Sequence, residues 1–272
     1  MTQRTTLITG VTHGMGRALA LDLAPRGGTL LLHGRDAERL AAVAAEARTA
    51  NPETTVHTYL ADLSDLDQVH AMAERIRAAE PRLDGVIHNA VAGGGARPLV
   101  REVSRQGHEL RFAVNHLAPY ALTRALLPLL VASAPARVVN VASMGQEALD
   151  FDDVMLERDY EGLRAYCRSK LAMIMATFEL AAELAGTGVT VNALHPAHLM
   201  DTPGVRDHGL TPVTTTEEGV RPTVRLLLDP DLDAVTGRYF DRFTEARAHE
   251  QAYDRAARER LMRLTDDLVG GR

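Results

Sequence analysis

Short apolar runs alternate with longer stretches of helical periodicity along most of this sequence. The short runs have the length and composition of buried strands, and they are Thr5–Thr9, Thr29–Leu32, Val56–Leu60, Val86–His88, Arg137–Ala142, Val189–Leu194 and Arg238–Phe240. The stretches between them place apolar residues three and four positions apart, which predicts helices. These helices are Gly14–Ala24, Ala37–Ala50, Leu66–Ala79, Leu110–Val131, Ala165–Ala185 and Val220–Leu228. Two prolines, Pro119 and Pro128, mark expected bends in the fourth of them.

The last part of the chain, Glu245–Leu268, predicts one more amphipathic helix. One face of this helix carries Tyr253, Ala257, Leu261, Leu264 and Leu268. Such a face packs on its own domain or binds a partner, and the sequence leaves both open while favouring the first.

Strands that alternate with helices predict parallel βαβ units with helices on both faces of one sheet. Several of the strands are continuously apolar, as strands covered on both faces should be. The chain shows no internal repeat, and the βα alternation continues on both sides of Gly93–Gly95. We therefore predict one doubly wound α/β domain over residues 1–272.

Composition narrows the class of protein further. Of 272 residues, 46% are hydrophobic and 24% are charged, which is ordinary globular usage and argues against disorder. Cys167 is the single cysteine, so no intramolecular disulfide can form. No signal-peptide layout or membrane-length apolar run is present. We expect a soluble cytoplasmic protein, and its net charge of −6 gives no reason to expect nucleic acid or a membrane as partner.

A glycine-rich turn joins the first predicted strand to the first helix. Gly10, Gly14 and Gly16 permit a tight turn and a close approach of the backbone to a pyrophosphate at the helix N-terminus. The spacing differs from the common G-x-G-x-x-G pattern, and such a turn is also found in purely structural roles. Its place at the start of a βαβ unit favours dinucleotide binding.

The end of the second strand bears on which dinucleotide is bound. An acidic side chain there would accept bonds from the ribose 2′-hydroxyl of NAD, whereas an arginine would receive the 2′-phosphate of NADP. The acidic position holds Gly34, and Arg35 follows. Asp36 is better explained as the N-cap of the next helix. We predict NADP(H), although a solvated surface charge is the alternative for Arg35.

A series of short motifs then follows the predicted strands in a fixed order. The motifs are Thr9–Gly16, Asp62–Leu63, Asn89–Ala90, Val114–Leu117, Ser143, Tyr166–Lys170 and His195–Pro196. Together they resemble the short-chain dehydrogenase/reductase family, across essentially the whole chain. The resemblance implies a Rossmann-type sheet, a nicotinamide cofactor and an oxidoreductase.

Some features resemble the retinol-dehydrogenase-type branch of that family in particular. They are the long segment between Ser143 and Tyr166, the Asn115–Leu117 motif, and Gly237–Phe240 followed by a charged helix. Relatives in that branch often carry a membrane anchor in front of the fold, which we do not find in this sequence. The Ala- and Arg-rich composition favours a bacterial source, so we expect a ketoreductase of bacterial secondary metabolism.

The single lysine of the chain indicates which residues are catalytic. The chain has 29 arginines and one lysine, Lys170, which lies four residues after Tyr166 and so shares its helix face. An ammonium beside a phenol lowers the phenol pKa toward the working pH of a general acid. A guanidinium would be a poor substitute where the cation must also bond the nicotinamide ribose. A surface ion pair of no function is the alternative.

The resemblance assigns the remaining roles by position. Tyr166 donates a proton to the carbonyl oxygen, Ser143 bonds that oxygen, and Asn115 supports an ordered water that leads from Lys170 toward solvent. The cofactor contacts it implies are Gly10, Thr12, His13, Gly14, Met15, Gly16, Arg35, Asp62, Leu63, Asn89, Ala90, Tyr166, Lys170, Pro196, Leu199 and Thr202. For His13 a solvent-facing position is an equal alternative.

Three positions depart from the family pattern. Val91 and Ala197 each stand where the family has glycine, so the backbone at both places is expected to be less open. Asp201 occupies the register of the threonine that contacts the nicotinamide amide, and Thr202 follows it. Either residue is a candidate for that contact.

Two further features have ordinary explanations that we prefer. His195 and His198 suggest a metal pair, but they are better explained by the His-Pro loop and the substrate side, so we predict no metal site. Cys167 suggests a redox switch, but it is better explained as a helix residue that points away from the site.

We therefore expect an NADPH-dependent oxidoreductase that acts on a small carbonyl or alcohol substrate. The alternatives are an NADP-binding regulator or scaffold without turnover, and an epimerase or a C=C or C=N reductase on the same fold. Specificity should lie in Gly93–Arg101, Met144–Tyr160 and Leu199–Thr216, beyond the strand ends. The resemblance also implies a homodimer through the helix that carries Tyr166.

Overall fold

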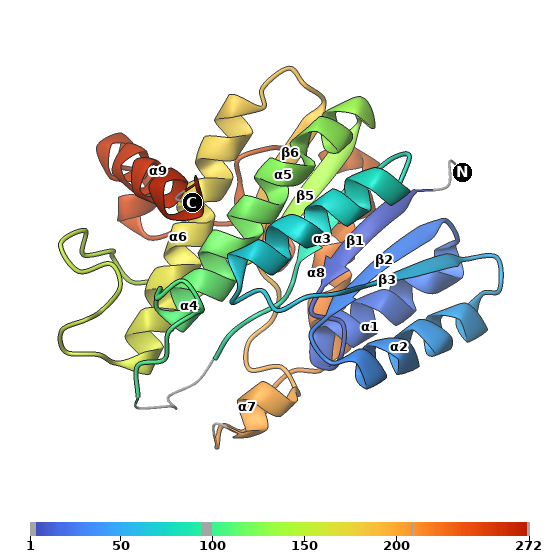
Figure 1. Cartoon of the computed structure of the whole chain (residues 1–272), viewed down its shortest axis with the longest axis horizontal. Coiled ribbons are helices and arrows are strands. Elements are labelled where there is room, and N and C mark those ends of the chain that lie inside the picture. The colour runs from blue at the N-terminus through green and yellow to red at the C-terminus, as the bar shows by residue number, and fades with distance from the viewer. Residues whose placement is uncertain (1–3, 94–99, 208, 271–272) are drawn as a thin grey trace.

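The computed structural model describes residues 4–93, 100–207 and 209–270. Its centre is a twisted sheet in the order β3-β2-β1-β4-β5-β6-β7-β8 (Figure 1). Neighbouring strands are parallel except for the last pair, β7 and β8. The strands are β1 Thr5–Thr9, β2 Thr29–Gly34, β3 Thr55–Leu60, β4 Gly85–His88, β5 Ala136–Val141, β6 Val189–His195, β7 Tyr239–Asp241 and β8 Thr244–Glu245. The doubly wound prediction is confirmed.

Helices cover both faces of this sheet. The helices are α1 Gly14–Leu23, α2 Ala37–Ala50, α3 Leu66–Ala79, α4 Leu110–Phe112, α5 Ala118–Ala132, α6 Gly162–Glu183, α7 Pro203–Asp207, α8 Thr216–Leu228 and α9 Arg255–Gly270. One apolar core lies between the sheet and α1, α2 and α8, and the other between the sheet and α3, α5 and α6. The central strands β2, β1, β4, β5 and β6 are therefore buried from both sides, whereas the edge strand β3 and the short β8 are largely exposed.

The start of α2 confirms the prediction for Asp36. Its side chain accepts a hydrogen bond from the backbone N–H of Arg39 at 3.0 Å, so it is the N-cap of α2. The same carboxylate lies 3.5 Å from the Arg39 guanidinium. Asp36 is thus occupied by its own helix, which leaves Arg35 as the charged residue at the end of β2.

The predicted helical stretch Leu110–Val131 is helical throughout, but its α-helical hydrogen bonding is interrupted ahead of Pro119. The structure divides it into α4, a π-helical turn at Ala113–Leu117 (η2) and α5. Pro119 explains the interruption, because proline has no N–H to donate to the carbonyl of Asn115 four residues earlier. The chain continues through Pro128 within α5. The π-turn is therefore centred on Asn115, a predicted site residue.

The predicted tail helix also begins later than expected. Thr244–Glu245 pairs with β7, and a 3-10 turn at Glu250–Tyr253 (η4) precedes α9. Asp254 ends that turn and accepts hydrogen bonds from the N–H groups of Ala256 and Ala257, which starts α9 at Arg255. Because of this local capping, α9 starts at Arg255 and not at Glu245, where the apolar pattern predicts it.

The apolar face of α9 packs on its own domain, against α6 (Figure 1). Its buried residues are Ala257, Leu261 and Thr265. Arg258 forms an ion pair with Glu179 of α6 at 2.5 Å, and the rings of Tyr253 and Phe178 lie 5.6 Å apart. One side of α6 is thus covered by η4 and α9 of the same chain.

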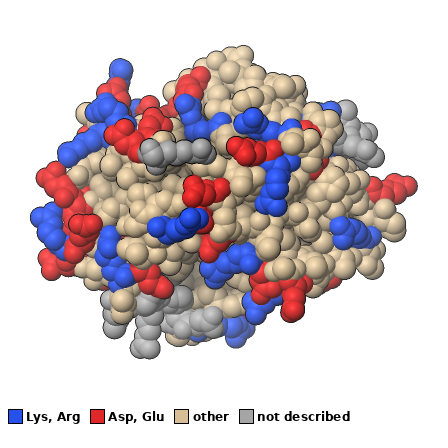
Figure 2. Space-filling model, in the orientation of Figure 1, with Lys and Arg blue, Asp and Glu red and all other residues tan. Residues whose placement is uncertain are grey.

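Basic and acidic side chains are interspersed on the face of the molecule shown in Figure 2. Surface arginines have carboxylate partners nearby, as in the pairs Arg17–Glu46 and Arg26–Asp22. The described residues on this face therefore form no large field of a single sign (Figure 2).

Candidate active site

A cavity of about 680 Å³ opens at the carboxyl ends of the central strands. Its size lies in the range of roughly 300–1,000 Å³ that is typical of small-molecule sites. The residues predicted to contact the cofactor line it, namely Gly10, Thr12, His13, Gly14, Met15, Gly16, Arg35, Asp62, Leu63, Asn89, Ala90, Tyr166, Lys170, Pro196, Leu199 and Thr202. Ser143 lines the same cavity. Asn115 lies behind its wall.

The glycine-rich turn is held in place by Asn89, which follows β4. The Asn89 amide donates hydrogen bonds to the carbonyls of Thr9 at 3.0 Å and of Gly10 at 3.1 Å. The Thr9 hydroxyl in turn accepts from the N–H groups of Asn89 and Ala90. These bonds fix the loop after β1 against the loop after β4, with the first turn of α1 facing the cavity. The predicted Asn89 position thus builds the turn as well as lining the site.

His33, which the sequence did not single out, holds the same turn from the other side. Its Nδ1 accepts from the Gly10 N–H at 3.2 Å, and its Nε2 donates to the Ala61 carbonyl at 3.1 Å. Burial lowers the pKa of His33 to about 4, so the ring is neutral near pH 7. The available sequence signal was a polar residue that ends an otherwise apolar strand.

No room exists for a side chain at Gly34. A Cβ atom there would lie 2.5 Å from the Cγ2 atom of Thr12, well inside normal contact distance. An acidic side chain that binds the 2′-hydroxyl of NAD would fit at this position only if the Thr12 side chain moved. Arg35 is exposed and lines the cavity, and no ion pair with it is found among the described residues. Its charge remains available to a ligand.

Tyr166 and Lys170 lie one turn apart on α6 and face the end of β5. The Lys170 side chain is only 2% exposed, and its Nζ donates to the carbonyl of Val141 at 2.8 Å. The same Nζ lies 5.8 Å from the centre of the Tyr166 ring. Ser143 Oγ accepts from the N–H of Gly145 at 3.0 Å. The three side chains therefore meet at one place in the cavity.

Burial dominates the proton affinities of this group. It lowers the pKa of Lys170 to about 7, because a charged ammonium is disfavoured away from water. It also raises the pKa of Tyr166, against a smaller lowering by the hydrogen bond with Ser143. The expected lowering of the Tyr166 pKa by Lys170 is therefore not found. A protonated Tyr166 suits the donation of a proton to a carbonyl oxygen.

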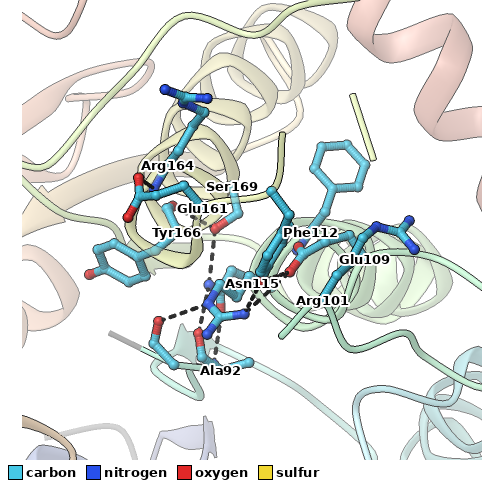
Figure 3. Close-up of polar contacts among 12 residues, drawn as sticks. Ala92, Arg101, Glu109, Phe112, Asn115, Glu161, Arg164, Tyr166 and Ser169 are labelled. Atoms are coloured by element: carbon cyan, nitrogen blue, oxygen red, sulfur yellow. Dashed lines mark hydrogen bonds and ion pairs between the residues drawn. The ribbon is translucent and has the colours of Figure 1, made fainter. Parts of the chain in front are cut away.

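Asn115 links the loop after β4 to α6, as Figure 3 shows. Its Oδ1 accepts from the Ala92 N–H at 2.8 Å, and its Nδ2 donates to the Ser169 hydroxyl at 3.0 Å. The Ser169 hydroxyl donates to the carbonyl of Tyr166 at 2.7 Å. Asn115 thus supports the helix that carries Tyr166, and its role in a water path stays a prediction.

Val91 and Ala197, which stand where the family has glycine, have backbone conformations that do not require glycine. Among the described residues, the non-glycine residues with a positive φ are Leu156, Asp159, Leu199 and Arg242, so Val91 and Ala197 are not among them. Val91 and Ala197 therefore occupy conformations that any side chain tolerates, so neither strains its loop.

The structure also separates the two candidates for the nicotinamide contact. Asp201 forms an ion pair with Arg206 at 2.6 Å on the surface. Thr202 lines the cavity beside Gly14. Thr202 is therefore the residue of the two that faces the cofactor side.

The substrate end of the cavity differs in part from the segments predicted for it. From Met144–Tyr160 the lining residues are Met144 and Gly145, and from Leu199–Thr216 they are Leu199, Met200, Thr202, Gly204, Val205 and Leu210. Residues 94–99 of the predicted Gly93–Arg101 segment lie outside the described residues. Leu110, Val114 and Leu163 complete this wall, and the sequence did not indicate them.

Cys167 is a correction to the sequence interpretation. Its thiol lines the cavity, and a Cβ atom on Gly145 would lie 3.2 Å from its Sγ. It therefore does not point away from the site. Burial, with Glu147 and Glu161 nearby, raises the Cys167 pKa to about 11, so the thiol stays protonated.

Comparison with known proteins decides the family. The family model described as short chain dehydrogenase matches residues 4–210. This chain belongs to the short chain dehydrogenase family. Human retinol dehydrogenase 13 is 36% identical to it, over 98% of this chain and 85% of that protein. Human retinol dehydrogenase 12 is 34% identical, over 97% and 85%.

These relatives place the chain in the retinol-dehydrogenase-type branch of the short chain dehydrogenases, a family of oxidoreductases. Solved structures agree on the fold. A short chain dehydrogenase from Escherichia coli CFT073 complexed with NADPH has a TM-score of 0.71 at 29% identity, with 88% of this chain and 95% of that chain covered. The Pseudomonas aeruginosa RhlG/NADP complex has a TM-score of 0.72 at 26% identity, with 88% and 94% covered.

The described residues of this short chain dehydrogenase contain neither a candidate membrane-spanning helix nor a candidate metal site. No helix in that part of the chain combines the length and apolar character needed to span a bilayer. Within the same residues, no three His, Cys, Asp or Glu side chains are grouped as ligands of a metal ion. The ring centres of His195 and His198 lie 6.5 Å apart.

Proposed function

We propose that this short chain dehydrogenase is an NADPH-dependent carbonyl reductase. The observation that carries the proposal is the meeting of Ser143, Tyr166 and Lys170 in one cavity with the glycine-rich turn at the start of α1. A proton donor, a hydrogen-bond partner for an oxyanion and a buried cation are the groups that carbonyl reduction requires. The same groups would serve the reverse oxidation of an alcohol.

The residues present fit an NADP-type cofactor better than an NAD-type cofactor. Thr12 fills the space that a side chain at position 34 would need, and Arg35 follows at the rim of the cavity. The N-terminus of α1 would hold the pyrophosphate, and Arg35 would pair with the 2′-phosphate. NADP-bound relatives of the same fold support this choice.

The chain's own residues would act on the carbonyl oxygen. When bound, the reduced cofactor supplies a hydride from C4 of its nicotinamide to the carbonyl carbon. Ser143 donates a hydrogen bond to the oxygen and so fixes its place beside Tyr166. Tyr166 delivers its proton to the oxygen as negative charge develops there. Lys170 in its protonated form would stabilise the phenolate that remains, and its lowered pKa of about 7 lets the ammonium give up a proton readily.

The proposal does not include a dimer through α6. In the structure η4 and α9 of the same chain lie against that helix, and Arg258 pairs with Glu179 on it. These segments occupy the part of α6 that they contact.

Cofactor binding tests the proposed role of Arg35. The purified protein is expected to bind NADPH at least about tenfold more tightly than NADH, equivalent to about 1.4 kcal/mol. Arg35→Ala should remove this preference by weakening the binding of NADPH but not of NADH, because the 2′-phosphate loses its partner. Arg39→Ala is the matched control, since Arg39 is an exposed arginine of the same segment that pairs with Asp36. Equal dissociation constants for both cofactors in the wild type would refute the NADP assignment.

A further inference from the structure

A buried charged cluster lies behind the substrate end of the cavity. Glu109 and Arg111 are each 1% exposed, and their side chains form an ion pair at 3.4 Å. The hydroxyl of Tyr160 joins them, because it donates to Glu109 Oε1 at 3.1 Å and accepts from Arg111 Nη1. The other carboxylate oxygen of Glu109 accepts from the N–H of Phe112 at 2.8 Å, which starts α4 (Figure 3). The catalytic proposal uses none of these side chains.

Arg111 connects two segments that are far apart in sequence. Its Nε donates to the carbonyl of Gly93 at 3.3 Å, in the loop after β4. Its Nη1 donates to Tyr160, which ends the long loop after β5. The space beside Gly93 is filled by the guanidinium itself, since a Cβ atom there would lie 2.8 Å from Arg111 Nη2. A single buried side chain thus sets the separation of the two loops.

Both loops reach the cavity close to this cluster. Gly93 lines the cavity directly, and Leu110 and Val114 line it from the same turn of chain as Arg111. Leu163 lines it three residues after Tyr160. A shift of the cluster would therefore move the wall that faces a substrate, while the turn that faces the cofactor is held separately by Asn89.

The cost of burying the Arg111 guanidinium without partners keeps its contacts in place. A buried guanidinium without partners is strongly disfavoured, so Arg111 keeps its two loop contacts together with Glu109. A lysine would carry the charge but could not span Gly93 and Tyr160 at once, because its ammonium is a compact point charge.

We propose that Arg111 is a positioning residue for the carbonyl substrate, which holds the Gly93 loop and the Tyr160 loop at a fixed separation. This inference rests on the proposed function. In this proposal the Glu109–Arg111–Tyr160 cluster affects the binding of substrate, but neither the binding of the cofactor nor the proton transfer from Tyr166.

The test compares Tyr160→Phe and Arg111→Lys with a matched control, Tyr59→Phe. Tyr59 also donates its hydroxyl proton to a buried glutamate, Glu80, but at the β3 edge of the sheet. Tyr160→Phe is expected to raise KM for a carbonyl substrate about fivefold, the effect of one lost hydrogen bond, with kcat changed less than about twofold. Arg111→Lys should raise KM further. The NADPH dissociation constant should not change in either variant.

Backbone hydrogen exchange reports on the same cluster without turnover. Peptides that contain Ala92–Gly93 and Glu157–Tyr160 should both exchange faster in Tyr160→Phe than in the wild type, and neither should change in Tyr59→Phe. Unchanged exchange in both peptides, or a KM equal to that of the wild type, would overturn the proposal. If the wild type reduces no carbonyl compound, the proposed function fails, and faster exchange at both loops would still support the link through Arg111.

Discussion

Tyr166→Phe is expected to lower kcat/KM for carbonyl reduction by about 10²–10⁴, the usual contribution of a general acid. The ring, its burial on α6 and the nearby Lys170 remain in this variant, and only the proton donor is lost. Binding of NADPH should stay within about twofold of the wild type, because the glycine-rich turn and Arg35 are unchanged. Steady-state kinetics with one aldehyde and a titration of NADPH binding measure both quantities.

Tyr120→Phe provides the control for Tyr166→Phe. The Tyr120 hydroxyl donates to Asp266 at 2.6 Å on the α9 side of α5, outside the cavity, so its loss should leave kcat/KM unchanged. Full turnover in Tyr166→Phe would remove the tyrosine from the chemistry. Full biological activity of Tyr166→Phe without carbonyl reduction would instead favour the alternative of a cofactor-binding regulator.

The second large effect is expected for Lys170→Met, which should lower kcat/KM at least about a hundredfold. Methionine has a similar length but carries no charge and donates no hydrogen bond to the Val141 carbonyl. The phenolate of Tyr166 would then form without a cation beside it. The chain has no second lysine that could replace this one.

The same variant should change how stability depends on pH. Lys170 has a pKa of about 7 in the folded protein, against an ordinary value of 10.5. Between these values the unfolded chain binds a proton that the folded chain does not, so this lysine makes the wild type more stable as pH rises. Methionine removes that contribution. The free energy of unfolding of Lys170→Met minus that of the wild type should be largest below about pH 7 and shrink toward about pH 10.

Denaturant unfolding of both proteins at about pH 6, 8 and 10 measures this difference. A difference that stays constant over the range would mean that Lys170 keeps its ordinary pKa in the folded state. The burial argument for its role beside Tyr166 would then fail.

The sequence predicted well whatever depends on local periodicity. Strands that lie under helices on both faces are rich in apolar residues, so the positions of most strands along the chain could be assigned from the sequence. Asp36 was predicted as a cap because a short acidic residue before a helical stretch has one common use. Tyr166 and Lys170 were found because their spacing places them on one helix face.

What the sequence could not show depends on contacts between distant segments. The start of α9 is decided by the Asp254 cap and by the pairing of β8 with β7. The spacing of apolar residues shows neither contact. Cys167 faces the cavity because Gly145 leaves room beside it.

The proton affinity of Tyr166 depends on tertiary structure in the same way. Its pKa is raised because burial outweighs the hydrogen bond with Ser143, and burial is a property of the folded chain. His33 was missed because its two hydrogen-bond partners come from the loops after β1 and β3.

Transfer of deuterium tests the central claim most directly. The protein would be incubated with NADPH that carries deuterium at both C4 positions of the nicotinamide and with a panel of aliphatic and aromatic aldehydes and ketones. The alcohol products would then be analysed by mass spectrometry. Our account predicts an alcohol that carries one deuterium on the former carbonyl carbon, formed by the wild type and nearly lost in Tyr166→Phe. Tight binding of NADPH without deuterium in any product, or equal transfer by the wild type and Tyr166→Phe, would contradict it.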